Sequence, residues 1–205
     1  MELKDILENL QDEIKFAEEN YVPIIRKKSA EYLYNFVKNH GYKNILEIGT
    51  AIGFSGSIIL GAGAESLTTI DINEDYLAKA SHTFDKFNFS DKVTILHGDA
   101  KYHIQKLLNE NKKYDMIFLD GAKGQYINYL QTLAKLLKDD GVIFADNVLL
   151  HGMVESDKKI PHKKRTMVVN LRKYLEVVNS YPYKTELIRL EDGIAITKVI
   201  GEEND

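Results

Sequence analysis

Short apolar runs alternate with longer amphipathic segments through most of this chain, and no other feature constrains the fold as strongly. Each run has the length of a buried strand, whereas the segments between the runs carry apolar residues at helical spacing. The runs span residues 44–48, 67–70, 93–96, 116–119 and 142–145. Strands that are separated by helices pair in parallel through right-handed crossovers. We therefore expect an α/β protein with a doubly wound, mostly parallel sheet and helices on both of its faces.

The helices themselves are predicted from apolar residues three or four positions apart. One amphipathic helix is expected between Leu3 and Ile14, and a second is expected to begin near Pro23 and to end at Gly41. Further helices are predicted over residues 76–87, 104–108, 126–137 and 167–178.

The end of the chain departs from this alternation. Residues 185–190 and 194–199 are two more apolar runs, and Asp192-Gly193 between them is typical of the turn of a hairpin. With the five earlier runs, they predict a Rossmann-like, seven-stranded sheet that finishes in an antiparallel hairpin.

Length and composition limit the class of protein further. A chain of 205 residues fits one domain, so we expect residues 1–205 to form a single domain. The chain has no cysteine, which excludes disulfides, zinc–thiolate sites and thiol nucleophiles. Its first residues do not have the pattern of a signal peptide, and no apolar run has the length needed to span a bilayer. A cytoplasmic protein without a membrane partner is expected.

The first candidate site follows the first two apolar runs, because ligands of doubly wound sheets bind beyond the carboxyl ends of the strands. Gly49 and Gly53 allow the loop to turn tightly and to approach a ligand, and Ser55 is placed to cap the next helix. Asp71 ends the second run about 20 residues later, the offset at which a carboxylate accepts ribose hydroxyls. These residues suggest a nucleoside cofactor, although a tight turn with a helix cap explains the loop equally well.

A third carboxylate follows the third run. Asp99 is a candidate acceptor for the adenine amino group of such a cofactor, and it is an equally good cap for the helix that begins at Ala100. The two roles are compatible.

Oxygen-donating side chains follow the fourth and fifth runs. Asp120 comes after one strand, and Asp146 and Asn147 come after its neighbour, so the three are expected at the same crevice. Three oxygen ligands without histidine or cysteine select Mg²⁺, or Mn²⁺ and Ca²⁺, over zinc or copper. Each residue alone is more often a cap or a turn residue. Their combination beside a nucleoside-type loop favours a metal site.

These motifs resemble those of a known family, in order and over nearly the whole chain. They are residues 46–55, Asp71, residues 98–100, 118–123 and 145–149. They look like the motifs of the cation-dependent O-methyltransferases related to catechol and caffeoyl-CoA methyltransferases. The resemblance implies the class I methyltransferase fold, a cytoplasmic homodimer and a transferase that uses S-adenosylmethionine. It also implies that the helices within residues 1–40 cap the cofactor and acceptor site.

The resemblance implies a role for each candidate residue. The cofactor would be held by Glu47 and Asp71 at its ribose, by Asp99 and Ala100 at its adenine, and also by Gly49, Gly53, Ser55 and Asp120. The metal would be held by Asp120, Asp146 and Asn147. Lys123 matches the family's catalytic lysine, which would either take the proton of the acceptor hydroxyl or stay protonated and stabilise the oxyanion.

The acceptor is suggested by an uneven distribution of charge. Seven positive charges and no acid lie between Lys158 and Lys173, although the chain as a whole has a net charge of -4. This stretch is either a solvated turn followed by the polar face of a helix, or a surface that binds phosphates.

Within the family, the chain looks most like the bacterial enzymes that methylate 5-hydroxyuridine at the wobble position of transfer RNA (tRNA). On this resemblance Lys163, Lys164 and Arg165 would contact the anticodon loop. A small catechol or phenol is the alternative acceptor.

Overall fold

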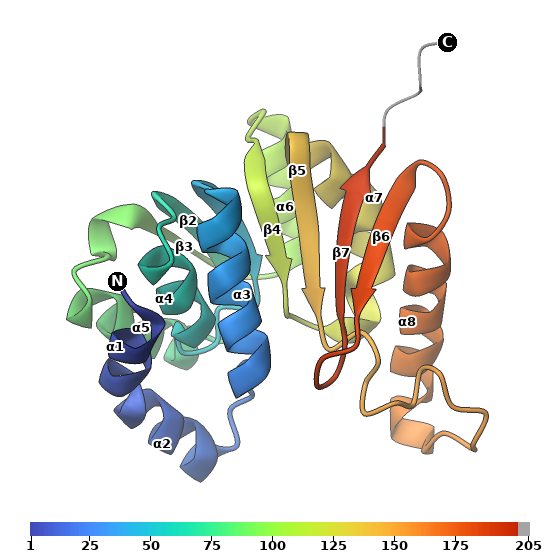
Figure 1. Ribbon diagram of the computed structural model, residues 1–205, viewed down its shortest axis with the longest axis horizontal. Helices are drawn as coiled ribbons and strands as arrows, with labels where there is room; N and C mark the ends of the chain where they lie inside the picture. The colour runs from blue at the N-terminus through green and yellow to red at the C-terminus, as the bar shows by residue number, and fades with distance from the viewer. Residues whose placement is uncertain (201–205) are drawn as a thin grey trace. The chain divides into compact units, whose positions relative to one another are not determined.

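The computed structural model of the protein describes residues 1–200, which fall into two compact units. The first unit is Met1–His103, and the second begins at Ile104 (Figure 1). Both units combine strands with helices, so the α/β class expected from the sequence is confirmed. The expectation of a single domain over residues 1–205 stays a prediction, and residues 201–205 lie outside the described residues.

The first unit contains three parallel strands in the order β3-β2-β1. The strands are β1 (Asn44–Ile48), β2 (Ser66–Asp71) and β3 (Val93–His97). The helices of this part of the chain are α1 (Leu3–Asn9), α2 (Gln11–Asn20), α3 (Lys27–His40), α4 (Phe54–Gly61), α5 (Glu74–Lys86) and α6 (Ala100–Asn109). A short 3-10 turn, Ser90–Lys92, precedes β3. The three strands match the predicted runs.

Helix α4 packs unusually closely on its neighbours, and this packing positions the loop before it. All of its residues are buried. A Cβ atom at Gly56 would lie 2.8 Å from Leu67 in β2 and 2.9 Å from Phe84 in α5, so only glycine permits the observed approach. The loop that ends β1 is therefore held against a rigid surface.

The N-terminal helices differ from the prediction of one helix up to Ile14. The chain forms α1 and α2, and the break lies at Leu10, whose backbone angles are φ -95° and ψ 12°. The Leu10 side chain is fully buried, and its amide still donates to the carbonyl of Ile6. Apolar spacing continues across this break because the buried face is shared, which is why the sequence pattern did not reveal it.

The start of α3 was also predicted wrongly. The helix begins at Lys27 rather than near Pro23, because the preceding residues are extended. This extended segment buries Val22 and Ile25, and that burial outweighs the preference of Pro23 for a first helical turn.

The second unit contains four strands in the order β4-β5-β7-β6. The strands β4 (Tyr114–Leu119) and β5 (Leu137–Asp146) are parallel, and β7 (Ile194–Val199) runs antiparallel to β5 and to β6 (Tyr183–Ile188). The helices are α7 (Tyr126–Leu136) and α8 (Arg165–Val178), and 3-10 turns are formed by Lys123–Gln125 and His162–Lys164.

The C-terminal hairpin predicted from Asp192-Gly193 is confirmed. Gly193 has φ +79°, and a Cβ atom there would lie 2.4 Å from Leu149, so this turn requires glycine. Figure 1 shows the hairpin of β6 and β7 with α8 alongside it. None of the helices formed by residues 1–200 is long and apolar enough to cross a bilayer.

Candidate active site

The predicted site residues divide between the two units. The first unit holds the residues expected at the cofactor, namely Glu47, Gly49, Gly53, Ser55, Asp71, Asp99 and Ala100. The second unit holds Asp120, Lys123, Asp146 and Asn147, together with the basic residues Lys163, Lys164 and Arg165.

The loop between β1 and α4 is compact and conformationally demanding. Gly49, Ala51 and Gly53 all have positive φ, at 105°, 43° and 79°. A Cβ atom at Gly53 would lie 3.1 Å from the backbone of Ala80 in α5. Glycines at the two ends of this loop are therefore required by backbone geometry and by close packing. Such a loop lets a ligand approach main-chain atoms directly.

Glu47 lies beneath this loop with its carboxylate fully buried. The hydroxyl of Ser55 donates to Oε1 at 2.5 Å, and that of Thr69 donates to Oε2 at 2.6 Å. Because Thr50 and Thr69 are also joined by a hydrogen bond of 2.6 Å, the buried carboxylate organises the start of the loop. A direct contact between Glu47 and ribose stays a prediction.

Ser55 therefore has a different role from the expected helix cap. The N-cap of α4 is Gly53, and Ser55 lies in the first turn with its hydroxyl on Glu47. A buried carboxylate is a stronger acceptor than a backbone carbonyl, so the hydroxyl of Ser55 is drawn inward. Nothing in the sequence singled out Thr69, because threonine is an ordinary strand residue.

Thr69→Val is expected to lower the free energy of unfolding by about 1–3 kcal/mol, because one donor to a buried carboxylate is lost while the shape of the side chain is kept. Urea unfolding measures this change. Thr68→Val is the matched control, since Thr68 is the half-buried neighbour in the same strand. Equal losses for both variants would contradict the assigned role of Thr69.

Two further carboxylates lie at the ends of their strands, as predicted. Asp71 Oδ2 accepts the amide of Ala51 at 2.9 Å, and Oδ1 accepts the amide of Asn73 at 3.0 Å. Asp71 thus ties the loop after β1 to the end of β2 and stays partly exposed.

Asp99 caps α6, which is one of the two roles expected for it from the sequence. Its Oδ1 accepts the amide of Lys101 at 2.8 Å, and Ala100 is the first residue of the helix. The Asp99 side chain is exposed, so capping leaves it accessible to a ligand.

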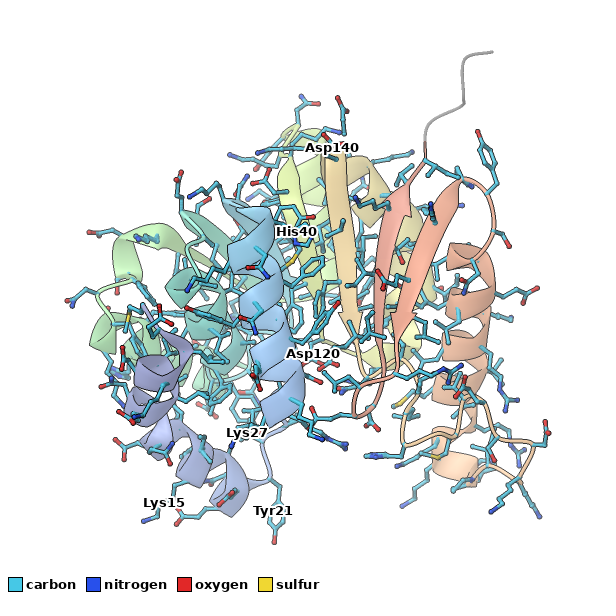
Figure 2. The ribbon with its side chains drawn as sticks, viewed as in Figure 1. Lys15, Tyr21, Lys27, His40, Asp120 and Asp140 are labelled. Atoms are coloured by element: carbon cyan, nitrogen blue, oxygen red, sulfur yellow. The ribbon has the colours of Figure 1, made fainter. Side chains whose placement is uncertain are left out.

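In the second unit, Asp120 and Asp146 form a pair of interacting carboxylates, of which Asp146 is buried and Asp120 is half-buried. Burial raises the pKa of Asp120, and an ion pair with Lys123, 2.9 Å from Nζ to Oδ1, opposes that rise. Burial and the charge of Asp120 raise the pKa of Asp146 to about 7. Figure 2 shows the place of Asp120 in this unit.

One oxygen of Asp146 is left without a partner. Its Oδ1 accepts the amide of Asn147 at 2.8 Å, whereas its buried Oδ2 has no hydrogen bond within residues 1–200. An unpartnered buried carboxylate oxygen destabilises a fold, and a bound cation is one partner that relieves this cost. Asn147 follows with φ +56°, a conformation that asparagine tolerates better than most residues.

The donor set fits a hard divalent cation. Within the described part of the chain no group of three or more His, Cys, Asp and Glu residues could hold a metal. The predicted set instead combines two carboxylates, Asp120 and Asp146, with the amide of Asn147. Oxygen-only sets of this kind suit Mg²⁺, which keeps several water ligands and needs few protein ligands.

Tyr126 holds the ends of β4 and β5 together. Its buried hydroxyl lies 2.9 Å from the carbonyl of Leu119 and 3.2 Å from that of Asp146. One acceptor belongs to Leu119, the residue before Asp120, and the other belongs to Asp146. Tyr126 therefore fixes the backbone at both carboxylates. This role was missed because an aromatic residue at the start of a helix is typical of the core.

Helix α8 positions the turn that carries Lys123. Asn170 donates from Nδ2 to the carbonyl of Gly124 at 2.7 Å. Lys123 is therefore held at its ammonium group by Asp120, and the next residue, Gly124, is held at its carbonyl by α8.

The basic stretch is not uniform. Lys163 and Arg165 are exposed and Lys164 is half-buried at the start of α8. Arg172 instead donates from Nε to the carbonyl of Val154 at 2.8 Å and from Nη2 to that of Ser156 at 2.7 Å. Arg172 therefore braces the loop after β5, and only part of the stretch is available to a ligand.

Mg²⁺ is expected to raise the midpoint of thermal unfolding more at about pH 8.5 than at about pH 6. The folded pKa of Asp146, about 7, exceeds its ordinary value of 3.8, so the folded protein binds this proton more tightly than the unfolded chain. Without metal, stability therefore falls as pH rises from about 4 to about 7. Below pH 7 the cation must displace the proton from the Asp146 carboxyl group in order to bind. An equal Mg²⁺ effect at both pH values would exclude Asp146 as a ligand.

Comparison with known proteins gives consistent matches. Residues 1–200 match the sequence profile of a family described as O-methyltransferase. Caffeoyl-CoA O-methyltransferase 2 of Eucalyptus globulus is 29% identical over 177 residues, which cover 82% of this chain and 70% of the relative.

Solved structures match over more of the chain than the Eucalyptus globulus relative does. A Staphylococcus aureus protein described as a candidate caffeoyl-CoA O-methyltransferase is 32% identical, with a TM-score of 0.81, and the match covers 97% of this chain and 98% of that protein. An O-methyltransferase from Bacillus cereus in complex with SAH has a TM-score of 0.84 at 23% identity, over 94% of this chain and 90% of that one. The predicted fold is therefore confirmed.

Proposed function

Because this chain belongs to the O-methyltransferase family, whose profile spans residues 1–200, we propose that it uses S-adenosylmethionine and a divalent cation to methylate a hydroxyl group. The family and the class I methyltransferase fold establish a methyltransferase enzyme. Family membership alone does not establish that the enzyme uses a cation or which acceptor it methylates. The observation that carries the cation is the buried Asp146, whose Oδ2 has no partner within residues 1–200 although Asp120 lies close enough to raise its pKa.

The loop after β1 supports S-adenosylmethionine as the methyl donor. Gly49 and Ala51 of this loop are half-buried, and Asp71 and Asp99 lie at the ends of the next two strands with partly or fully exposed side chains. The Bacillus cereus relative was solved with SAH, the product of methyl donation. Doubly wound folds bind nucleotides beyond the carboxyl ends of their strands, with an acidic residue on the ribose.

The second unit supports the cation and the proton transfer. A divalent cation held by Asp120, Asp146 and Asn147 would lower the pKa of a chelated acceptor hydroxyl and orient two vicinal oxygens. Lys123 Nζ, already 2.9 Å from Asp120, then either takes the hydroxyl proton or stays charged and stabilises the oxyanion. Transfer from a sulfonium to an oxyanion neutralises opposite charges, so a site that excludes water favours it.

We take 5-hydroxyuridine at the wobble position of tRNA as the acceptor. Its 5-hydroxyl and 4-carbonyl are vicinal oxygens, as in a catechol. The exposed cations Lys163 and Arg165, with Lys164 between them, suit the phosphates of an anticodon loop. A small catechol or phenolic acceptor is the second candidate, supported by the caffeoyl-CoA O-methyltransferases among the relatives. We also propose that the enzyme is a homodimer.

Methyl transfer from labelled S-adenosylmethionine tests the acceptor. With Mg²⁺, label should enter tRNA that carries 5-hydroxyuridine, and charge reversal at Lys163, Lys164 and Arg165 should raise KM for tRNA without affecting small catechols. Charge reversal at the exposed residues Lys4, Lys106 and Lys112 is the matched control for net charge. Label that enters catechols alone, with no effect of the first triple variant, would end the tRNA proposal.

A further inference from the structure

An aromatic ring at the end of α2 is almost completely exposed. Tyr21 is 93% exposed and has left-handed backbone angles, φ 54° and ψ 34°. Glycine or asparagine is usual at such a helix end, because other side chains strain the backbone. Figure 2 shows the ring pointing away from the ribbon. Tyr21 thus gives the fold neither a favourable backbone nor buried area.

Three consecutive cations follow at the start of α3. Arg26, Lys27 and Lys28 are all exposed, and the first turn of the helix contains no acid. Helix N-termini favour negative charge, so cations there cost stability unless an anion is bound nearby. Within residues 1–200 neither Lys27 nor Lys28 has an ion-pair partner. The charges of Lys27 and Lys28 are available to an external anion.

The segment between the ring and the cations is anchored, so their spacing is maintained. Val22 and Ile25 are buried, and the amide of Val22 donates to the carbonyl of Ala17 at 2.9 Å. Figure 2 places Lys27 at the same end of the first unit as Tyr21. An exposed ring alone is common on protein surfaces, but a ring and three cations at the two ends of one anchored segment match the chemistry of unpaired nucleotides.

We propose that Tyr21, Arg26, Lys27 and Lys28 form a surface that binds an unpaired RNA strand, with a base stacked on Tyr21 and phosphates on the cations. The inference rests on the proposed tRNA acceptor and adds a contact surface in the first unit, separate from Lys163–Arg165. A stacking ring with a basic track is how proteins bind single strands without reading their sequence. The ring is accessible over most of its surface, as stacking requires.

Fluorescence anisotropy with a labelled anticodon stem–loop RNA tests this surface. Tyr21→Ala should raise Kd about tenfold, whereas Tyr21→Phe should keep wild-type affinity, because stacking needs only the ring. Lys27→Ala/Lys28→Ala should reduce the slope of log Kd against log salt by about 1.4, or about 0.7 for each lost phosphate contact. Lys4→Ala/Lys106→Ala removes the same charge from exposed ion pairs and should leave the slope unchanged.

Methylation of tRNA by the wild-type enzyme, measured in parallel, separates the two proposals. If the wild type methylates tRNA but Tyr21→Ala and Lys27→Ala/Lys28→Ala bind RNA as it does, the surface is wrong and the proposed function stands. If the wild type neither binds nor methylates RNA, both fail. A larger effect of Tyr21→Ala on coenzyme A binding than on RNA binding would assign the surface to a thioester substrate and overturn the RNA proposal. Thermal unfolding of each variant checks that the fold is intact.

Discussion

Asp146→Asn is expected to lower kcat/KM for methyl transfer at least about a hundredfold while leaving the protein folded. The substitution keeps the shape of the side chain but removes the charge that a divalent cation needs. Metal catalysis contributes several kcal/mol to transition-state stabilisation, and each 1.36 kcal/mol corresponds to about tenfold in rate. A large loss of activity therefore follows from one buried carboxylate.

Stability should change in the opposite direction from activity. Above pH 7, without metal, the ionised Asp146 is a buried charge next to Asp120, and the pKa of about 7 records that cost. At about pH 8 the metal-free Asp146→Asn protein should thus unfold at the same temperature as the wild type or higher. Asp140→Asn, an exposed acid of the same strand labelled in Figure 2, is the matched control and should change neither property. A variant with full activity, or one that loses activity only because it unfolds, contradicts the assigned role.

Lys123→Met is expected to lower kcat by about 10²–10⁴-fold, the range for loss of a positioned acid–base group, with little change in the affinity for S-adenosylmethionine. The ammonium group is mostly buried and pairs with Asp120 at 2.9 Å. Its removal should also raise the pKa of Asp120, since Lys123 lowers that pKa by its charge and hydrogen bond. Rapid-quench measurement of a single turnover gives the chemical rate.

Lys123→Arg distinguishes the two roles left open by the sequence. Arginine keeps the positive charge but cannot give up a proton in a protein. Substantial recovery of rate over Lys123→Met identifies an electrostatic role, whereas no recovery identifies a base. Lys138→Met breaks the comparable ion pair with Asp115 in the same unit, 2.7 Å long, and should leave kcat unchanged. An equal loss of rate in this control would attribute the effect to ion pairs in general.

The buried strands could be predicted because a strand covered on both faces needs few polar positions, so its apolar run was visible. The prediction was less accurate for β6, which spans Tyr183–Ile188 rather than residues 185–190 and has no buried residue. The exception in length is β5, which begins at Leu137 rather than Val142. Its first half contains exposed polar residues, and only Leu137 of that half pairs with β4, opposite Tyr114, before the register shifts and Val142 pairs with Met116. No apolar run therefore marks this half of the strand. The break at Leu10 was hidden for a related reason, because apolar spacing reports the buried face and not the backbone path.

The candidate site was predictable where chemistry lies at a strand end. Asp120 and Asp146 could be located from the apolar runs before them, because parallel strands end at a common edge. The residues that position them could not be predicted in this way. Tyr126 acts through its hydroxyl, and only folding brings the two carbonyl acceptors near it. The same is true of Ser55, whose partner Glu47 is eight residues away in sequence and beneath the loop in space.

The rate of methyl transfer as a function of free Mg²⁺ shows whether the enzyme needs a divalent cation. We expect a saturable rise with Mg²⁺, a return to background when EDTA is added, and recovery when Mg²⁺ or Mn²⁺ is restored. A rate that is the same in excess EDTA as in Mg²⁺ would contradict this expectation, because Asp120, Asp146 and Asn147 would then have no cation to hold.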